Sequence, residues 1–293
     1  MNQTTTVGFL GTGIMGAPMA RNCGSAGLDV RGWNRTPEKA RALADAGVTP
    51  VDSPAEAVRG AGAVVTMLTD GAAVEAVMAG DGGALAAMDD DAVWLQMSTV
   101  GTAATERLAA LARERGTGYV DAPVVGTRQP AEAGELLVLA SGPEELRGRA
   151  APVFDAVGRA TRWVGEEPGP ASRLKLVFNG WLVSLMESLS ETLAFSRAMG
   201  IPPEEFLEAI DGSPMNLPYA QTKGRAMAKM DFSEVAFPLR LAHKDARLVL
   251  EAAEAEDLDL PLMHTAEAQF ARAEAEGHGD EDLAAVHHAV RAA

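Results

Sequence analysis

The sequence contains little cysteine, few aromatic residues and a deficit of positive charge. Its 293 residues include one cysteine, 5% aromatic residues, and 25 lysines and arginines against 41 aspartates and glutamates, so the formal net charge is −16. One cysteine cannot form an intrachain disulfide and fits a reducing cytoplasm, where we expect Cys23 to be a small buried apolar residue rather than a nucleophile. The acidic balance argues against nucleic acids and anionic membranes as partners.

Long hydrophobic runs are also missing. No stretch of 18 apolar residues occurs, and no charged-then-apolar leader precedes the first predicted strand, so we expect neither a membrane span nor an export signal. The 47% hydrophobic and 23% charged residues are typical of a soluble globular protein. The length of 293 residues favours two domains over one.

A glycine-rich turn near the start is the most informative feature that is present. A short apolar run ends in the pattern G-x-G-x-x-G, and a helix-like run follows at once. In a dinucleotide site, the first glycine permits a tight strand-to-helix turn, the second lets the backbone approach a pyrophosphate, and the third allows close packing of helix on strand. The N-terminus of that helix offers N–H groups to the phosphates. The pattern therefore predicts cofactor contacts from Gly11, Thr12, Gly13, Ile14, Met15 and Gly16.

The second predicted strand indicates which dinucleotide is preferred. A typical NAD site has an acidic residue at the end of this strand to bind the ribose 2′-hydroxyl, but here Asn34 is followed by Arg35 and Thr36. An amide, a guanidinium and a hydroxyl suit a 2′-phosphate, which a carboxylate would repel. The same residues could also form a turn in which Thr36 caps the next helix. We expect NADP(H) to be the preferred cofactor, with NAD(H) as an open alternative.

Alternating patterns predict the architecture of residues 1–165. Short β-rich runs alternate there with alanine-rich amphipathic stretches, which is typical of a Rossmann-type α/β domain with a parallel sheet covered by helices on both faces. Ligands of such a sheet bind at the carboxyl ends of its strands. The expected strands are 5–10, 29–33, 63–68, 92–97, 118–122, 136–141 and 161–164, and the clearest helices are 37–46 and 102–115.

After residue 165 the pattern changes. A segment rich in glycine and proline is followed by an apolar-rich stretch, 171–199, whose helix would be apolar on too many sides for a surface position. Further helices are expected at 202–210, 242–256 and 264–276. We therefore expect an NADP-binding domain over 1–165 and an all-helical substrate and dimerisation domain over 166–293, with chemistry in the cleft between them. The long helix also suggests a homodimer or homotetramer.

Lys175 and Asn179 are the candidate catalytic residues of the long helix. They are four residues apart and so share one face. The surrounding positions are apolar, and a lysine in the first turn opposes the helix dipole. Desolvation favours the neutral form of such a lysine, which suits general acid–base catalysis. A solvated lysine with a backbone-bound asparagine is the alternative.

Several motifs resemble those of the β-hydroxyacid dehydrogenase family, which includes 3-hydroxyisobutyrate dehydrogenases. The opening run GFLGTGIMGAPMARN is similar to the family signature, and the similarity continues across the whole chain at 97–99, 121–126, the Lys175 helix, 237–239 and 244–245. Residues 126–134 and the Lys175–Asn179 spacing look most like the glyoxylate/succinic semialdehyde reductase branch. This resemblance implies NADPH-dependent reduction of small aldehyde acids, in which Lys175 protonates the developing alkoxide and Asn179 holds the lysine in place.

The resemblance also implies the other binding residues. Met67, Leu68, Thr99 and Lys244 would contact the cofactor, whereas Ser98, Thr99, Val125, Gly126, Thr127, Phe237 and Asp245 would bind or wall the substrate. No metal is implied.

Val125 departs from the family pattern, because relatives commonly have a serine there that helps to hold the substrate carboxylate. Without a replacement, the lost hydrogen bond to an anion costs on the order of 1.5–3 kcal/mol. Backbone N–H groups of Gly126 and Thr127, or the Thr127 hydroxyl, would have to serve instead. An imine reductase and a non-catalytic NADP-binding scaffold are therefore alternatives, although the presence of Lys175 argues against both.

Overall fold

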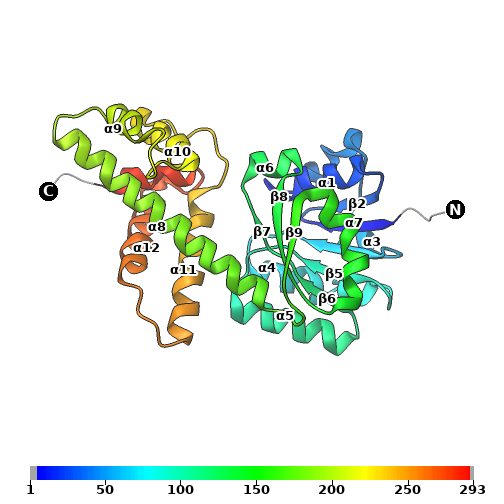
Figure 1. The fold of residues 1–293 in the computed structure, drawn as a ribbon. Helices are drawn as coiled ribbons and strands as arrows, with labels where there is room; N and C mark the ends of the chain where they lie inside the picture. Colours follow the sequence, from blue (N-terminus) through cyan, green and yellow to red (C-terminus); the bar gives the residue numbers. More distant parts are fainter. Residues whose placement is uncertain (1–4, 291–293) are drawn as a thin grey trace. The chain divides into compact units, whose positions relative to one another are not determined.

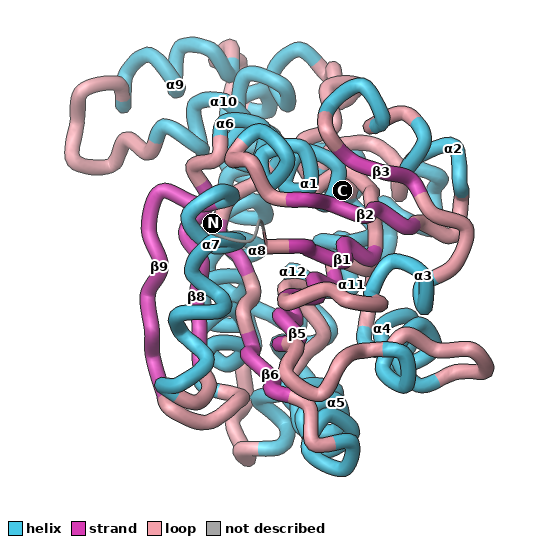
Figure 2. The backbone as a smooth tube through the Cα atoms, turned by 90° about the vertical axis from the view of Figure 1, so that its right-hand side faces the viewer, coloured by secondary structure: helices cyan, strands magenta, loops and turns pink. Residues whose placement is uncertain are grey.

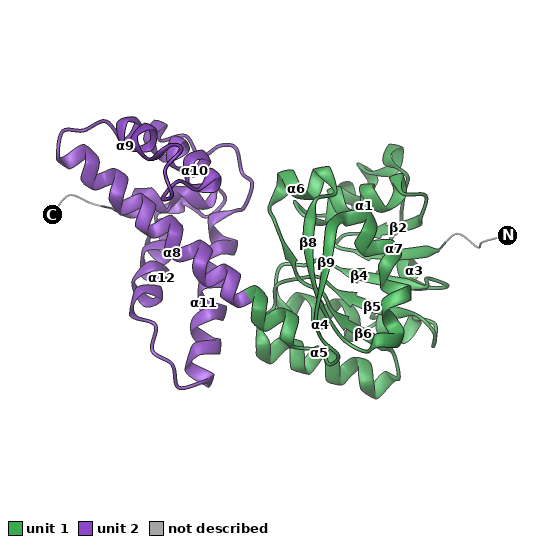
Figure 3. Cartoon of the chain, in the orientation of Figure 1, with its two compact units in different colours: residues 1–175 green, residues 176–293 purple. Residues whose placement is uncertain are grey.

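The computed structural model describes residues 5–290, which form two compact units. Unit 1 extends to Lys175 and unit 2 begins at Leu176, as the two colours in Figure 3 show. Within the described range, no helix combines the length and apolar character that a membrane span requires.

One sheet forms the centre of unit 1. Six strands pair in parallel in the order β3-β2-β1-β4-β5-β6, and Figure 2 shows several of them side by side in magenta. The order reverses between β1 and β4, so a ligand crevice is expected at the carboxyl ends of these two strands. The strands are β1 (Thr6–Leu10), β2 (Asp29–Trp33), β3 (Val48–Pro50), β4 (Ala63–Thr66), β5 (Val93–Gln96) and β6 (Gly118–Asp121).

The sheet departs from a uniformly parallel arrangement at one edge. β8 (Leu136–Ser141) runs antiparallel to β6 and to the short β7 (Val124–Val125), while β9 (Gly158–Gly165) is parallel to β8. Between β6 and β8 the chain forms only β7 and a short helix, so it returns from the same end of the sheet. An eleven-residue helix connects β8 to β9 and allows them to be parallel.

Helices cover both faces of the sheet and create two apolar cores (Figure 1). Side chains of a strand alternate between faces, so Leu95 of β5 enters one core while its neighbour Trp94 enters the other. Cys23 lies in the first core, is fully buried as expected, and has its thiol pKa raised to about 12 by burial. The helices on this face are α1 (Gly16–Ser25), α6 (Arg128–Ala133) and α7 (Arg147–Val157), and those on the other are α3 (Pro54–Val58), α4 (Gly71–Ala79) and α5 (Thr102–Arg115).

Most expected elements of unit 1 are present within a few residues of their predicted bounds. The helix expected at 37–46 is shorter, because α2 (Pro37–Arg41) is followed by a separate 3-10 turn at Ala44–Ala46. The strands β3 and β7 were not expected, since three and two residues are too few to carry a periodic pattern.

Unit 2 is helical and has one apolar core of its own. The long helix α8 contributes buried Val183, Met186 and Leu193 to that core. The helix α10 and the final 3-10 helix were not expected from the sequence. The elements are α8 (Pro170–Ala198), α9 (Pro203–Ile210), α10 (Pro218–Lys229), α11 (Leu239–Ala255), α12 (Pro261–Ala273), a π-helical turn (Glu274–His278) and a 3-10 helix (Leu283–Ala289).

A buried ion pair in unit 2 links α10 to the start of the final 3-10 helix. The Lys223 Nζ of α10 lies 2.8 Å from each carboxylate oxygen of Asp282. Asp282 also accepts the N–H of Ala236 and caps the 3-10 helix through the N–H of Ala284. One carboxylate therefore links α10, the loop at Ala236 and the start of the final 3-10 helix.

The two units divide within α8, whose first six residues belong to unit 1. The domain boundary expected at 165/166 stays a prediction. These first residues pack with unit 1 because the sheet binds them through Asp121, as described below.

Candidate active site

The glycine-rich loop between β1 and α1 has the geometry that a pyrophosphate needs. Gly11 has a φ of +104°, and a Cβ there would lie 2.3 Å from the Met67 carbonyl oxygen. At Gly16, a Cβ would lie 1.9 Å from the Gly11 carbonyl oxygen. By contrast, a Cβ at Gly13 would meet no atom within 4 Å. The outer glycines are thus required by packing, whereas the space over Gly13 fits the close approach of a phosphate group.

Asn34 ties the end of β2 to this loop. Its Oδ1 accepts the N–H of Thr12 at 3.1 Å, and its Nδ2 donates to the Thr36 carbonyl at 3.1 Å. Arg35 and Thr36 are exposed beside it. Thr36 does occupy the N-cap position of α2, but its side chain makes no capping hydrogen bond. The amide therefore organises the turn and leaves the guanidinium in the solvent, where a 2′-phosphate could meet it.

Ser98 joins the ends of β4 and β5. The Ser98 hydroxyl donates to the Thr66 carbonyl at 3.1 Å and accepts the N–H of Leu68 at 2.9 Å, and the side chain is fully buried. Leu68 and Met67 in turn lie against Gly11, where an added Cβ would come within 3 Å of both. These bonds hold Met67 and Leu68 next to the glycine-rich loop and leave half-buried Thr99 at the end of the strand.

The Val125 segment contains a strained turn. Val125 ends β7 and is half-buried, opposite Leu137 of β8. Gly126 has a φ of +133°, and a Cβ there would lie 2.7 Å from the Leu136 side chain. Thr127 is the N-cap residue of α6 but does not cap it with its hydroxyl. Only glycine fits at the centre of this turn.

Asp121, at the end of β6, is a site residue that the sequence reasoning missed. Its carboxylate is fully buried and accepts the N–H and hydroxyl of Ser172 at 2.8 and 2.7 Å, the N–H of Gly169 at 3.1 Å and the hydroxyl of Ser141 at 3.3 Å. Burial raises the pKa of this carboxyl, and the four hydrogen bonds oppose that rise. An acidic residue at the end of a buried strand was the available signal.

These bonds fix the start of α8, and with it Lys175. The Ser172 N–H and hydroxyl lie in the first turn of that helix, so Asp121 acts as its N-terminal cap. Lys175 follows three residues later and is half-buried. The sheet of unit 1 therefore positions the first turn of α8, and Lys175 lies in the turn that follows.

Unit 2 brings together three of the residues expected from the sequence. Asn179 of α8 is 1% exposed, and its Nδ2 donates to Asp245 Oδ2 of α11 at 2.9 Å. Asp245 Oδ1 lies 2.8 Å from the Nζ of its neighbour Lys244. Phe237, which is half-buried, precedes α11 in the loop that Asp282 binds. Asp245 thus tethers Asn179, one turn after Lys175 on the same helix.

Comparisons with known proteins agree with this arrangement of motifs. Residues 6–165 match the family described as the NAD binding domain of 6-phosphogluconate dehydrogenase. Residues 169–290 match the family described as NAD-binding of NADP-dependent 3-hydroxyisobutyrate dehydrogenase. Together the two matches cover both units.

Similar proteins match over nearly the whole chain. Glyoxylate/succinic semialdehyde reductase 2, chloroplastic, of Arabidopsis thaliana is 34% identical over 99% of this chain and 80% of that protein. The 3-sulfolactaldehyde reductase of Escherichia coli (strain K12) is 31% identical over 97% of this chain and 95% of the relative. A crystal structure of 3-hydroxyisobutyrate dehydrogenase from Salmonella typhimurium has a TM-score of 0.90 and 28% identity, covering 98% of this chain and all of that one.

The glycine-rich loop, the long helix that carries Lys175 and Asn179, and these matches lead to one assignment. The chain belongs to the β-hydroxyacid dehydrogenase family, of which the 3-hydroxyisobutyrate dehydrogenases are members, and is an NAD(P)-dependent oxidoreductase.

Proposed function

We propose that this enzyme reduces a small aldehyde or keto acid with NADPH, or oxidises the corresponding hydroxy acid in the reverse direction. Two relatives described above are named as reductases of glyoxylate, succinic semialdehyde or sulfolactaldehyde, which are all small anionic aldehydes. The observation that carries the proposal is the spacing of Lys175 and Asn179, four residues apart on α8, with Asn179 held by buried Asp245. This arrangement offers a positioned cation to a developing alkoxide.

Lys175 is the proposed general acid. NADPH, when bound, supplies the hydride that reaches the carbonyl carbon, and the carbonyl oxygen then needs a proton. Lys175 Nζ gives that proton and its positive charge stabilises the oxygen beforehand. Asn179 cannot turn freely because its amide is bonded to Asp245, so it presents its remaining oxygen in a fixed direction.

The proposed cofactor contacts come mainly from unit 1. The loop from Gly11 to Gly16 holds the pyrophosphate, and Asn34, Arg35 and Thr36 hold the 2′-phosphate of NADP(H). The absence of a carboxylate at the end of β2 supports this preference, since a carboxylate there would repel the phosphate. Met67, Leu68 and Thr99 are proposed to line the cofactor, and Lys244 to contact it.

The proposed substrate contacts are backbone groups around Gly126 together with neighbouring side chains. The backbone N–H groups of Gly126 and Thr127, at a turn that requires glycine, would replace the serine hydroxyl that is missing at Val125. Thr127 of unit 1, and Phe237 and Asp245 of unit 2, are the other residues proposed to contact the substrate. We propose that Ser98 acts indirectly, because its hydroxyl is already bonded to two backbone groups.

The chain is proposed to form a homodimer or homotetramer through unit 2. Large apolar side chains of α8 are exposed, including Val177 at 69%, Trp181 at 64% and Phe195 at 66%. Their spacing places them along one side of the helix. Light scattering of the protein and of Phe195→Glu tests this, and an unaltered assembly in the variant would contradict it. The cytoplasmic location expected from the sequence stays a prediction, since the Arabidopsis relative named above is chloroplastic.

An assay panel tests the proposed reaction. NADPH and NADH oxidation would be followed with glyoxylate, succinic semialdehyde, tartronate semialdehyde, methylmalonate semialdehyde and a cyclic imine. The proposal expects the highest kcat/KM for one of the aldehyde acids with NADPH. Turnover of the cyclic imine alone would identify an imine reductase, and cofactor binding without any turnover would identify a scaffold.

A further inference from the structure

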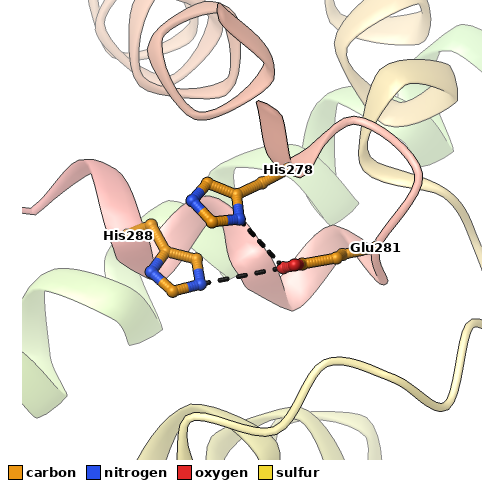
Figure 4. A group of neighbouring side chains, drawn as sticks. All are labelled: His278, Glu281 and His288. Carbon is orange, nitrogen blue, oxygen red and sulfur yellow. Dashed lines mark hydrogen bonds and ion pairs between the residues drawn. The ribbon is translucent and has the colours of Figure 1, made fainter. Parts of the chain in front are cut away.

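Two histidines and one glutamate converge near the C-terminal end of unit 2. His278 ends the π-helical turn, Glu281 follows in the next loop, and His288 lies in the final 3-10 helix. All three side chains are half-buried, and Figure 4 shows both rings beside the carboxylate. None of them belongs to the proposed catalytic or cofactor-binding set.

The three ligand atoms are close to the spacing that one metal ion imposes. Glu281 Oε2 lies 3.1 Å from His278 Nδ1 and 3.7 Å from His288 Nε2, and all three atoms lie within 4.8 Å of one another. A tetrahedral zinc ion with bonds of about 2.0–2.2 Å holds its ligand atoms roughly 3.3–3.6 Å apart. The two measured separations lie on either side of that range.

The chemistry of the three side chains favours a transition metal. Two imidazoles and a carboxylate form a donor set that zinc accepts, with water in the fourth position. Hard ions such as Mg²⁺ prefer oxygen ligands alone and are not expected to compete. Within the described residues, this is the one group of three such side chains whose ligand atoms come so close together.

One ring must turn for the ion to bind. The rings of His278 and His288 are stacked, with centroids 3.8 Å apart and planes inclined by 10°. A metal ion lies in the plane of each imidazole that binds it, so two parallel stacked rings cannot bind the same ion. His278 is the ring expected to turn, because Gly277 and Gly279 give the backbone on both sides of it more conformational freedom, and Gly277 has a φ of +101°. His288 is held more firmly by an edge-to-face contact with Phe232.

We propose that His278, Glu281 and His288 form a binding site for a divalent transition-metal ion, with Zn²⁺ as the expected ion. Such an ion would join the π-helical turn to the final 3-10 helix, on both sides of Asp282. It would therefore stabilise the same part of unit 2 that the Lys223–Asp282 pair holds together.

The test is direct metal binding by the full chain, with any affinity tag removed and metal stripped by EDTA. ZnCl₂ is titrated by calorimetry into the protein and into His278→Ala, His288→Ala and His264→Ala. His264 is the matched control, because it is an exposed histidine of unit 2 with one carboxylate nearby, at 3.9 Å. The proposal expects one site per chain in the wild type and in His264→Ala, and at least tenfold weaker binding in the other two variants.

Two further measurements keep the result independent of folding and of catalysis. Thermal unfolding without zinc should be similar in all four proteins, and zinc should raise the unfolding temperature only where the site is intact. Co²⁺ bound at the site should show visible absorption that is lost in His288→Ala. Failure of the wild type to bind Zn²⁺ at 100-fold excess would overturn the proposal, and so would binding by His278→Ala and His288→Ala as tight as that of the wild type.

Discussion

The two units supply their proposed functional groups in different ways. In unit 1 the cofactor site is mostly backbone, because Gly11, Gly13 and Gly16 shape a loop whose N–H groups are available to phosphate. In unit 2 the site is made of side chains, with Asn179 and Asp245 bonded across two helices. A site made of backbone groups is encoded by consecutive residues. A site made of side chains depends on packing between distant segments, and Asn179 and Asp245 are 66 residues apart.

This difference predicts how each unit responds to substitution. Changes in the loop of unit 1 should alter cofactor affinity, while changes on α8 should alter turnover and leave affinity unchanged. The following experiments test that contrast.

The largest expected effect is that of Lys175→Ala. If Lys175 protonates the alkoxide, turnover should fall by at least about 10²-fold, the usual scale of general acid catalysis. NADPH affinity, measured by fluorescence titration, should barely change. Lys229→Ala, which removes an exposed lysine of α10, is the control and should behave as the wild type. Near-normal turnover in Lys175→Ala would assign the proton to another donor.

Gly13→Ala tests the backbone site in isolation. Its Cβ would meet no protein atom within 4 Å, so the unfolding temperature should not change. The methyl group would occupy space proposed for the pyrophosphate, and NADPH should bind roughly 30-fold more weakly, equivalent to about 2 kcal/mol of hydrogen bonding to charge. Gly148→Ala is the matched control, since its Cβ also meets no atom within 4 Å. Unchanged affinity in Gly13→Ala would place the pyrophosphate elsewhere.

Arg35→Ala tests cofactor choice. Loss of a guanidinium that meets the 2′-phosphate should weaken NADPH by roughly 20-fold and leave NADH nearly unaffected. The readout is the ratio of kcat/KM values for the two cofactors. Arg41→Ala on the neighbouring α2 is the control. An unchanged ratio would show that Arg35 does not contact the 2′-phosphate.

Val125→Ser tests the departure from the family pattern. A serine donor aimed at a substrate carboxylate should raise kcat/KM for glyoxylate or succinic semialdehyde by roughly tenfold, the effect of about 1.4 kcal/mol. Neutral aldehydes should gain little. Equal gains for both kinds of substrate would refute the carboxylate explanation, and a selective loss for the acids would mean that Val125 packs against the native substrate.

Glu187 provides the smallest effect and concerns stability alone. It lies buried on α8 without a hydrogen-bond partner among the described residues. Burial, and to a smaller extent the negative charge of Glu191, raises its pKa from 4.5 to about 7. Because folding raises the pKa of this carboxyl, the folded state binds the proton more tightly than the unfolded state. The resulting stabilisation is complete below the unfolded pKa of 4.5 and is lost as the pH rises through about 7.

Glu187→Gln should remove this pH dependence. Between pH 6 and pH 8 the wild type should lose about 1 kcal/mol more unfolding free energy than the variant, measured by denaturant titration. Exposed Glu208→Gln is the control and should follow the wild type. Parallel pH profiles for the wild type and Glu187→Gln would show that water or an ion already compensates the buried charge.

Much of unit 1 could be predicted from the sequence because its signals are local. Alternating patterns placed β2 and α5 at their observed bounds, and the spacing of Gly11, Gly13 and Gly16 gave the loop geometry. The antiparallel β8 could not be predicted in this way, because strand direction depends on how the chain returns and not on the strand residues.

The site was less predictable where a residue acts through a distant partner. Lys175 and Asn179 were proposed from their spacing and from the family resemblance, and their roles stay predictions. Nothing near Asp121 in the sequence shows that it caps a helix beginning some 50 residues later. Ser98 was expected near the substrate, and its hydroxyl instead bonds backbone groups of the neighbouring strand. In both cases the partner is supplied only by the fold.

The ion pair between Lys223 and Asp282 has a consequence for synthesis of the chain. Unit 1 is a compact unit that ends at residue 175, so we expect it to fold while the rest is still being translated. Unit 2 cannot: until Asp282 emerges, Lys223 has no counter-ion, and a buried charge without one is strongly destabilising. Unit 2 should therefore remain open to proteases and chaperones until very late in translation, and premature termination before residue 282 should leave a folded unit 1 joined to an unfolded helical segment.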